Sequence, residues 1–292
     1  MSAPSKWPLP AAGIRFLTPA FMADYLASNT LTKECFPTAM GYYPRAVGHR
    51  MQRERHDDNL LIYCIDGRGS ISTSQWEGPV RRGDVVLLPR GHSHLYEAQR
   101  DEPWTLYWAH FQGSATRSFL DYLGFKEQRP VVTAGVSPVL IGAFKSLMEV
   151  RKTGYSTSAF IKAANQLRYL LSQFASEIMA EAGRSRGGFD IAAVQAYMQE
   201  NIDQNLTLAQ LAASANMSKY HFSARYKAHS GYSPVKHFLN MKMEHACALL
   251  DGTDLTVGAV AERLGYEDAL YFSRSFSRTI GLSPRAYRAS IR

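Results

Sequence analysis

Residues 218–234 and 268–284 are two copies of one pattern, and this repeat restricts the possible folds more than any other feature of the chain. Both copies contain a Phe-Ser pair, a second aromatic residue four positions after the Phe, a glycine and a final Ser-Pro. Each copy follows a short apolar stretch that begins after Thr207 or Thr256, and a threonine at such a position caps a helix. A short helix, a tight turn and a second helix closed by glycine form a helix-turn-helix unit, so the sequence predicts two such units.

The second helix of each unit has an apolar face and a basic face. Phe222 and Tyr226, like Phe272 and Phe276, stand four residues apart and share one side of their helix, which we expect to pack inward. After its first residue, neither copy of the repeat contains an acidic residue. A basic helix face without acids suits the phosphate-lined groove of a nucleic acid. The alternative, a merely solvated face, is disfavoured because the feature occurs in both copies.

Residues 261–288 contain every element of the signature A-x-x-x-G-[FY], Y-F-S-R-x-F and G-x-[ST]-P-x-x-[YF]-R. On these motifs, the region of about residues 190–290 resembles the AraC/XylS family of transcription regulators. The resemblance implies two helix-turn-helix units, each placing a helix in the major groove of DNA. It also implies the positions that contact DNA, which are Lys219, Tyr220, Ser223 and Lys227 in the first copy and Leu270, Tyr271, Arg274 and Arg278 in the second. Packing at the start of the helix is the alternative role for the two tyrosines.

The first half of the chain has the pattern of a sheet. The runs 60–65, 85–89 and 104–111 are apolar or alternating and are bounded by Gly, Pro or Asp, as short strands are. Several short strands at this spacing predict an antiparallel β-barrel or a double-sheet jelly roll.

A helix is predicted at residues 158–181, because apolar residues recur there at helical spacing. This apolar stripe suits core packing against the barrel, and the family resemblance implies that it also pairs two chains; we expect dimerisation through it. Residues 182–188, AGRSRGG, break the pattern and are the predicted linker. The predicted domains are therefore residues 1–181, for ligand binding and dimerisation, and residues 189–292, for DNA binding.

Residues 83–94 fit the pattern G-x5-P-x-G-x2-H and resemble the second signature motif of cupins. In cupin enzymes the last histidine of this motif ligates a metal together with an earlier H-x-H pair. No H-x-H occurs in the preceding region, where His49 and His56 stand seven apart, and a metal site needs three or four converging ligands. The sequence therefore predicts no metal and no other cofactor, with His92 and His94 in a loop or at a pocket rim.

The first half also resembles, more weakly, the sugar-sensing domain of AraC-type regulators, which holds a small molecule inside its barrel. The resemblance implies a ligand site formed by Arg53, Tyr96, Leu106 and Trp108, with His94 at its rim and Phe16 as a lid on an N-terminal arm of residues 1–20. In such a site Trp108 stacks on the apolar face of a sugar ring, and Arg53 binds hydroxyl groups or a carboxylate. An ordinary place in the barrel core is the alternative for Trp108.

Composition agrees with a nucleic-acid partner. The 33 basic and 25 acidic residues give a net charge of +8, which favours a polyanion. Cys35, Cys64 and Cys247 are isolated, so neither a disulfide framework nor a Cys-based zinc site is expected, and a reducing cytoplasmic compartment fits. The chain contains no apolar run long enough for a membrane span, so none is expected. Its first residues lack the apolar segment of a secretory signal.

Together these observations predict two domains: an N-terminal cupin-like antiparallel β-barrel or jelly roll followed by helices, and a C-terminal all-α domain with two helix-turn-helix units. The leading hypothesis is a ligand-responsive, sequence-specific transcription regulator without enzymatic activity, whose effector is a sugar or a related metabolite. Its expected partners are double-stranded operator DNA, the small-molecule effector, a second copy of the chain and RNA polymerase. The alternative is a cupin-type metal enzyme fused to a DNA-binding domain. A purely architectural DNA-binding protein is disfavoured, because it would not need a pocket-bearing half.

Overall fold

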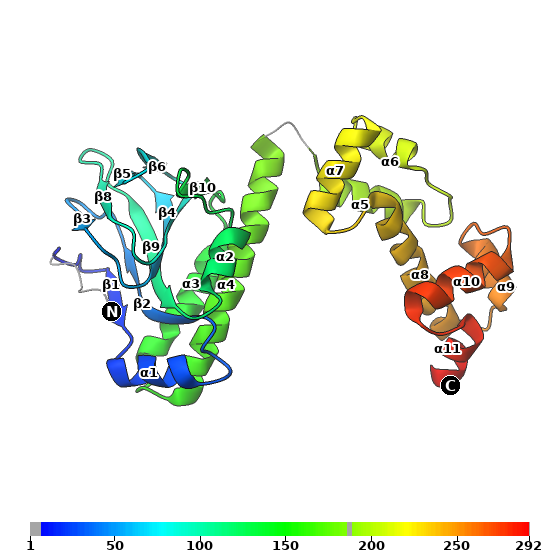
Figure 1. The fold of residues 1–292 in the computed structure, drawn as a ribbon, viewed down its shortest axis with the longest axis horizontal. Coiled ribbons are helices and arrows are strands. Elements are labelled where there is room, and N and C mark those ends of the chain that lie inside the picture. Colours follow the sequence, from blue (N-terminus) through cyan, green and yellow to red (C-terminus); the bar gives the residue numbers. More distant parts are fainter. Residues whose placement is uncertain (1–6, 186–188, 292) are drawn as a thin grey trace. The chain divides into compact units, whose positions relative to one another are not determined.

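The computed structural model describes residues 7–185 and 189–291, and the chain divides into two compact units, residues 1–182 and 183–292 (Figure 1). The N-terminal unit contains two sheets in which all neighbouring strands are antiparallel, as the sequence predicts. The six-stranded sheet has the order β1 (Ile14–Leu17), β2 (Phe36–Tyr43), β9 (Thr105–Gln112), β4 (Asn59–Asp66), β7 (Asp84–Leu88) and β10 (Val131–Thr133). The four-stranded sheet has the order β3 (Arg50–Arg53), β8 (His94–Ala98), β5 (Arg68–Thr73) and β6 (Glu77–Arg81).

Both faces of the six-stranded sheet are covered, which explains why its central strands are almost continuously apolar. Along β9, Leu106 and Trp108 belong to the core cluster that the two sheets share. Their neighbours Tyr107 and Ala109 point the opposite way and belong to a second cluster, which packs under the helices. A strand buried on both sides lacks the polar–apolar alternation of a strand with one solvated face. Its sequence therefore does not show which side chains point to which cluster, and the neighbouring strands and helices determine this.

Four α-helices and a short 3₁₀ helix accompany these sheets among the described residues of the N-terminal unit. They are α1 (Ala20–Ser28), α2 (Thr116–Tyr122), α3 (Pro138–Met148), the 3₁₀ helix Glu149–Lys152 and α4 (Thr157–Ser185). Figure 1 shows α3 and the long α4 running along one face of the sheet. Leu140 of α3 and Phe174 of α4 are fully buried in the helix-covered cluster.

The structure bears on two expectations about α4. Its apolar stripe, including Phe160, Leu167 and Leu171, is buried against the sheet of its own chain, in agreement with core packing, and the pairing of two chains through this helix stays a prediction. The helix also runs to Ser185, so residues 182–185 of the predicted linker are helical, and residues 186–188 lie outside the described residues. A glycine inside a helix costs only about 1 kcal/mol relative to alanine, which a long packed helix outweighs at Gly183.

The C-terminal unit is helical throughout its described secondary structure and contains both predicted helix-turn-helix units. Its helices are α5 (Ile191–Glu200), α6 (Leu208–Ser214), α7 (Lys219–Ser230), α8 (Pro234–Gly252), α9 (Val257–Arg263), α10 (Ala269–Ile280) and α11 (Pro284–Ile291). The pairs α6–α7 and α9–α10 each surround a core of their own. The connecting helix α8 contributes Phe238 to the first core and Met243, Ala246 and Leu250 to the second.

Side-chain caps and glycines set the limits of these helices. Thr207 and Thr256 accept hydrogen bonds from backbone N–H groups in the first turns of α6 and α9, as the sequence predicts. Gly231 and Gly281, the equivalent glycines of the repeat, end α7 and α10 with φ of 76° and 88°. A residue with a side chain is strained at such an angle, so these glycines define where both helices stop.

Candidate functional site

The two repeated helices have the faces that the sequence predicts. Phe222 and Tyr226 of α7, like Phe272 and Phe276 of α10, are fully buried. On the opposite faces, the predicted contact residues Lys219, Tyr220, Lys227, Leu270, Tyr271, Arg274 and Arg278 are exposed, and Ser223 is half-buried. Each unit thus presents a row of predicted contact side chains to solvent.

Large apolar side chains are exposed at the start of each of these helices. Tyr220 is 80% exposed and Leu270 is 74% exposed, so neither packs into its own core. Tyr271 is also exposed, although its ring lies 6.1 Å from that of Tyr266. Exposed apolar groups beside cations are typical of a surface that binds a partner.

Arg274 has one weak ionic contact. Its guanidinium lies 4.0 Å from a carboxylate oxygen of Asp268, and both side chains are largely exposed. Exposed pairs of this kind contribute little stability, so the guanidinium can leave Asp268 for a stronger partner. Asp268 itself caps α10 by accepting a hydrogen bond from the N–H of Leu270 at 2.7 Å.

The predicted ligand residues of the N-terminal unit, except Phe16, come together between the two sheets. Leu106 and Trp108 on β9 and Tyr96 on β8 belong to the shared core cluster and are buried. The ring of His94 stacks on that of Tyr96, with centroids 5.7 Å apart. Arg53 ends β3 and pairs with His94 across the four-stranded sheet.

Phe16 lies on the wrong face to be a lid, and this expectation is corrected. It packs against the helix-covered cluster, with its ring 6.3 Å from that of Phe160. Because β1 pairs with β2, alternation turns its neighbour Arg15 towards the other face, where Arg15 Nε donates to the hydroxyl of Tyr43 at 2.9 Å.

Trp7 is the residue of the N-terminal segment that packs against the cluster between the sheets. Its ring lies 5.0 Å from that of Tyr43 and 4.8 Å from that of His49, and its Nε1 donates to the carbonyl oxygen of Val47 at 2.9 Å. Arg15 also donates to the Trp7 carbonyl oxygen at 3.1 Å. The signal available in the sequence was a lone tryptophan among prolines, in a segment without periodicity.

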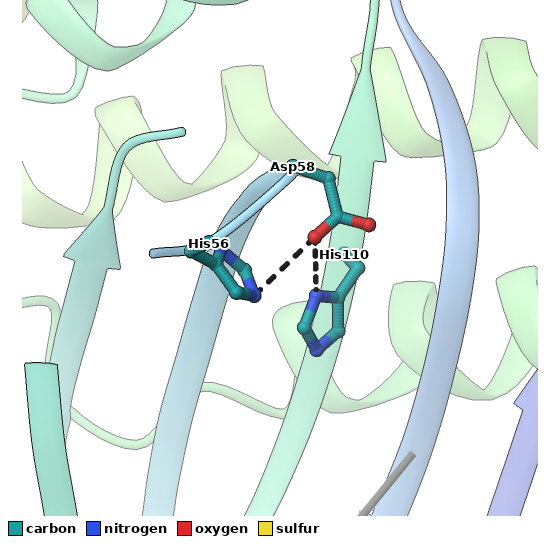
Figure 2. Close-up of side chains that lie close together, drawn as sticks. All are labelled: His56, Asp58 and His110. Atoms are coloured by element: carbon teal, nitrogen blue, oxygen red, sulfur yellow. Dashed lines mark hydrogen bonds and ion pairs between the residues drawn. The ribbon is translucent and has the colours of Figure 1, made fainter. Parts of the chain in front are cut away.

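A cluster of three titratable side chains lies beside Trp108, and the sequence analysis missed it. His56 and Asp58 come from the segment before β4, and His110 comes from β9 (Figure 2). Asp58 Oδ1 lies 3.3 Å from His56 Nε2 and 3.0 Å from His110 Nδ1. The ring of His110 is 5.3 Å from that of Trp108.

Hydrogen bonds and burial control the charge of this cluster. The hydroxyl of Thr38 donates to Asp58 Oδ2 at 2.7 Å. Burial alone would raise the pKa of Asp58, but the hydrogen bonds from His110 and Thr38 outweigh it and keep the carboxyl ionised. Burial lowers the pKa of His56 to about 3. Burial and the nearby charge of Arg53 lower the pKa of His94 to about 4. Both imidazoles are therefore neutral near pH 7.

Three side chains with atoms that can ligate a metal thus lie close together, although no H-x-H pair precedes the motif that begins at Gly83. His56 and Asp58 have the H-x-H spacing with a carboxylate in place of the second imidazole, a pattern the sequence could have revealed. His110 is 52 residues away and joins them only through strand pairing. His92 is separate from the cluster: it is partly exposed, with Nε2 3.3 Å from Glu127 Oε1.

A double-sheet unit with an enclosed polar cluster, followed by a pair of helix-turn-helix units, defines a DNA-binding regulator with a sensing domain. Residues 36–184 match the family model of the AraC-like ligand binding domain, and residues 211–290 match the model of a helix-turn-helix domain. The chain therefore belongs to the AraC family of transcription regulators. No helix in the part that the structure describes is long and apolar enough to cross a membrane.

Similar proteins are regulators of operons. The MmsAB operon regulatory protein of Pseudomonas aeruginosa is 42% identical over 100% of this chain and 95% of its own length. The raffinose operon transcriptional regulatory protein RafR of Pediococcus pentosaceus is 26% identical over 80% of this chain and 86% of its own. Among solved structures, the C-terminal domain of AraT, a response regulator from Geobacillus stearothermophilus, is 34% identical with a TM-score of 0.33; it covers 34% of this chain and 84% of its own.

Proposed function

We propose that this protein is a sequence-specific DNA-binding regulator that responds to a small molecule bound between the two sheets of its N-terminal unit. The family supplies the general function, since its members named above regulate operons. The observation that carries ligand binding is Trp108. Its side chain is buried, and the hydroxyl of Tyr43 lies close to its indole Nε1 without meeting full hydrogen-bond geometry.

A buried donor without a well-aligned acceptor costs up to about 3 kcal/mol, so a ligand that supplies such an acceptor gains part of this energy. A sugar or a related hydroxylated metabolite has both features that the site asks for: oxygens for the indole N–H and an apolar ring face for stacking. Arg53 and His94, opposite each other on β3 and β8, add polar groups on the second sheet. The naming of one relative as a raffinose operon regulator agrees with a sugar.

On the DNA side, the proposal assigns contact roles to Lys219, Tyr220, Ser223, Lys227, Leu270, Tyr271, Arg274 and Arg278. Arginine can bind guanine bidentately in the major groove, whereas lysine is suited to phosphates. Helix α8 has 19 residues and connects the two helix-turn-helix units. At 1.5 Å per residue its length is about 28 Å. That length is near the ~34 Å of one turn of duplex DNA.

The proposal also includes a second copy of the chain, RNA polymerase as a partner and a cytoplasmic location, with no enzymatic activity. Because the apolar stripe of α4 is used inside the chain, a homodimer would need another surface, such as the exposed side of α4 that carries Tyr169. One relative is named a lactose operon transcription activator, which supports contact with the polymerase.

A thermal-shift screen of sugars and small acids tests ligand binding. A ligand at 100 times its dissociation constant adds about 2.7 kcal/mol of stability. We expect a hit that raises the melting temperature of the full chain, changes its affinity for operator DNA and is lost in Trp108→Leu. Tyr122→Leu, a substitution of an exposed aromatic residue outside the proposed site, serves as the control. A hit that stabilises Trp108→Leu equally would contradict the proposed site.

The alternative, a cupin-type metal enzyme joined to a DNA-binding unit, is favoured by one observation, the cluster of His56, Asp58 and His110. It predicts metal-dependent turnover of the ligand that the screen identifies. Recovery of that ligand unchanged after incubation with the metal-loaded protein would exclude this alternative.

A further inference from the structure

His56 is the most unusual polar side chain of the N-terminal unit. It is fully buried, and in the described part of the chain neither of its ring nitrogens has a partner with hydrogen-bond geometry. Its Nε2 lies 3.3 Å from Asp58 Oδ1, so the two are close enough for an ion pair but not aligned for a hydrogen bond. An imidazole buried in this way loses its hydrogen bonds to water and gains none from the protein. A bound ion or ligand would compensate for this loss.

The two distances from Asp58 to the imidazoles are close to those between ligands of one metal ion. Asp58 Oδ1 lies 3.3 Å from His56 Nε2 and 3.0 Å from His110 Nδ1, and one ligand atom from each residue lies within 4.8 Å of the others. Bonds of about 2.0–2.1 Å to a tetrahedral ion separate neighbouring ligand atoms by roughly 3.3–3.4 Å. An ion bound by all three residues would replace the contact between His110 and Asp58 and would require the two imidazole nitrogens to lie at the same spacing.

The surroundings orient these groups as an outer shell does around a metal. Thr38 holds Asp58 Oδ2 by a hydrogen bond of 2.7 Å, so the other oxygen, Oδ1, faces the imidazoles. His94 lies beside His56, with ring centroids 5.0 Å apart. Its Nδ1 lies 3.2 Å from the carbonyl oxygen of His92, and donation there leaves a lone pair on the buried, unpartnered Nε2. Metal-binding histidines commonly have such a bond on the other nitrogen.

We propose that His56, Asp58 and His110 bind a divalent transition-metal ion inside the N-terminal unit, with His94 adjacent as a fourth ligand. A purely structural hydrogen-bond network would account for the contact between Asp58 and His110. It would not account for His56, which that network leaves without a hydrogen bond. The identity of the effector does not enter this argument, although His94 is also part of the proposed effector site.

The charges around the cluster determine which ions fit. Asp58 supplies one negative charge, and the positive charge of Arg53 acts on both His56 and His94. A hard cation such as Mg²⁺ or Ca²⁺ depends on several oxygen ligands and is disfavoured here. Zn²⁺ and Co²⁺ bind neutral imidazole well, so the site should select them.

Titration of the untagged, metal-free full chain with Zn²⁺ alone tests the proposal. We expect one equivalent to bind and to raise the melting temperature, with no such effect from Mg²⁺. Asp58→Asn keeps the size of the side chain, and we expect it to weaken Zn²⁺ binding by more than about 100-fold, since changes in the outer shell alone cost 10–100-fold. Thr38→Val should weaken it by about 10–100-fold.

His92→Ala is the matched control, because His92 and Glu127 form a separate, partly exposed pair that also could attract metal. We expect it to leave the tight site intact. Absence of stoichiometric Zn²⁺ binding, or binding lost in His92→Ala but kept in Asp58→Asn, would overturn the proposal.

A second measurement leaves the four proposed metal-binding residues unchanged, so its outcome does not depend on whether their variants fold. The ring of Trp108 lies 5.3 Å from that of His110, so Co²⁺ in the cluster should quench Trp108 fluorescence. Trp108→Phe should then remove more of the quenching than Trp76→Phe does. Equal losses, or no quenching at all, would place any bound ion elsewhere.

Discussion

The ammonium of Lys242 donates a hydrogen bond to the carbonyl oxygen of Leu264 over 2.7 Å, in the interior of the C-terminal unit. Lys242 lies on the connecting helix α8, and Leu264 follows α9 of the second helix-turn-helix. The same ammonium contacts Asn205 Oδ1 at 3.2 Å, in the segment before α6. It also lies over the rings of Phe238 and Tyr266, at 5.2 and 5.1 Å. One buried lysine therefore joins the two helix-turn-helix units through the helix between them.

Lys242 should make the stability of this unit increase in mild alkali. Burial, partly offset by Asp203, lowers its pKa from 10.5 to about 8. Between these values the unfolded chain holds a proton that the folded chain has lost, so the free energy of unfolding rises with pH, by up to about 1.4 kcal/mol per pH unit. We expect denaturation followed by far-UV ellipticity to give a more positive slope against pH between 8 and 10 for the natural chain than for Lys242→Met, because the raised pKa values of Cys247 and Tyr266 oppose the rise in both proteins. Identical slopes would mean that Lys242 is not titrating there.

Arg274 and Lys227 should differ in how they bind DNA. If Arg274 reads a base, Arg274→Ala weakens binding to the true operator by about 1–3 kcal/mol and relaxes preference at one position. Lys227→Ala, as a lost phosphate contact, weakens all sequences alike and reduces the salt slope by about one unit. Operator and unrelated DNA should be titrated at several salt concentrations. A uniform loss in Arg274→Ala would assign that side chain to the backbone instead.

Phe272 should be indispensable for the second helix-turn-helix. It is fully buried beside Phe276, with ring centroids 5.9 Å apart, and deletion of a buried Phe side chain costs about 3–5 kcal/mol. We expect Phe272→Ala to lose protection from amide exchange in α9 and α10 and to lose operator binding. Thr279→Ala, on the exposed side of α10, is the control and should keep the fold. A stable, DNA-binding Phe272→Ala protein would show that packing of α10 depends on other contacts.

The arm that carries Trp7 should couple the ligand to DNA binding. Trp7 packs on Tyr43 and His49, next to the cluster between the sheets, and can be held there or released. Trp7→Ala, like deletion of residues 2–8, which spares β1, should leave operator binding intact but reduce the change in affinity that the effector causes. Phe21→Ala, at an exposed aromatic on α1, is the control. A full response in the arm-deleted protein would exclude the arm as the switch.

Local pattern determined much of this protein. The apolar pair Phe222 and Tyr226 is set by helical period, the caps at Thr207 and Thr256 by hydrogen bonding within one turn, and the helix ends by the glycines of the repeat. These features depend on residues a few positions apart, so the repeat predicted both helix-turn-helix units and, through its signature motifs, the family.

Only the tertiary structure decided which side chains meet across paired strands and which face of each helix or strand turns inward. The stripe of α4 suits a partner chain or the protein's own sheet equally well, and only packing shows that the sheet takes it. Phe16 and Arg15 differ by one position, and the register of β1 with β2 decides which of them turns inward. His110 reaches Asp58 because β9 pairs with β4. Contacts across 52 residues leave no periodic trace in a sequence, since each strand's pattern records its own burial and not the identity of its neighbour.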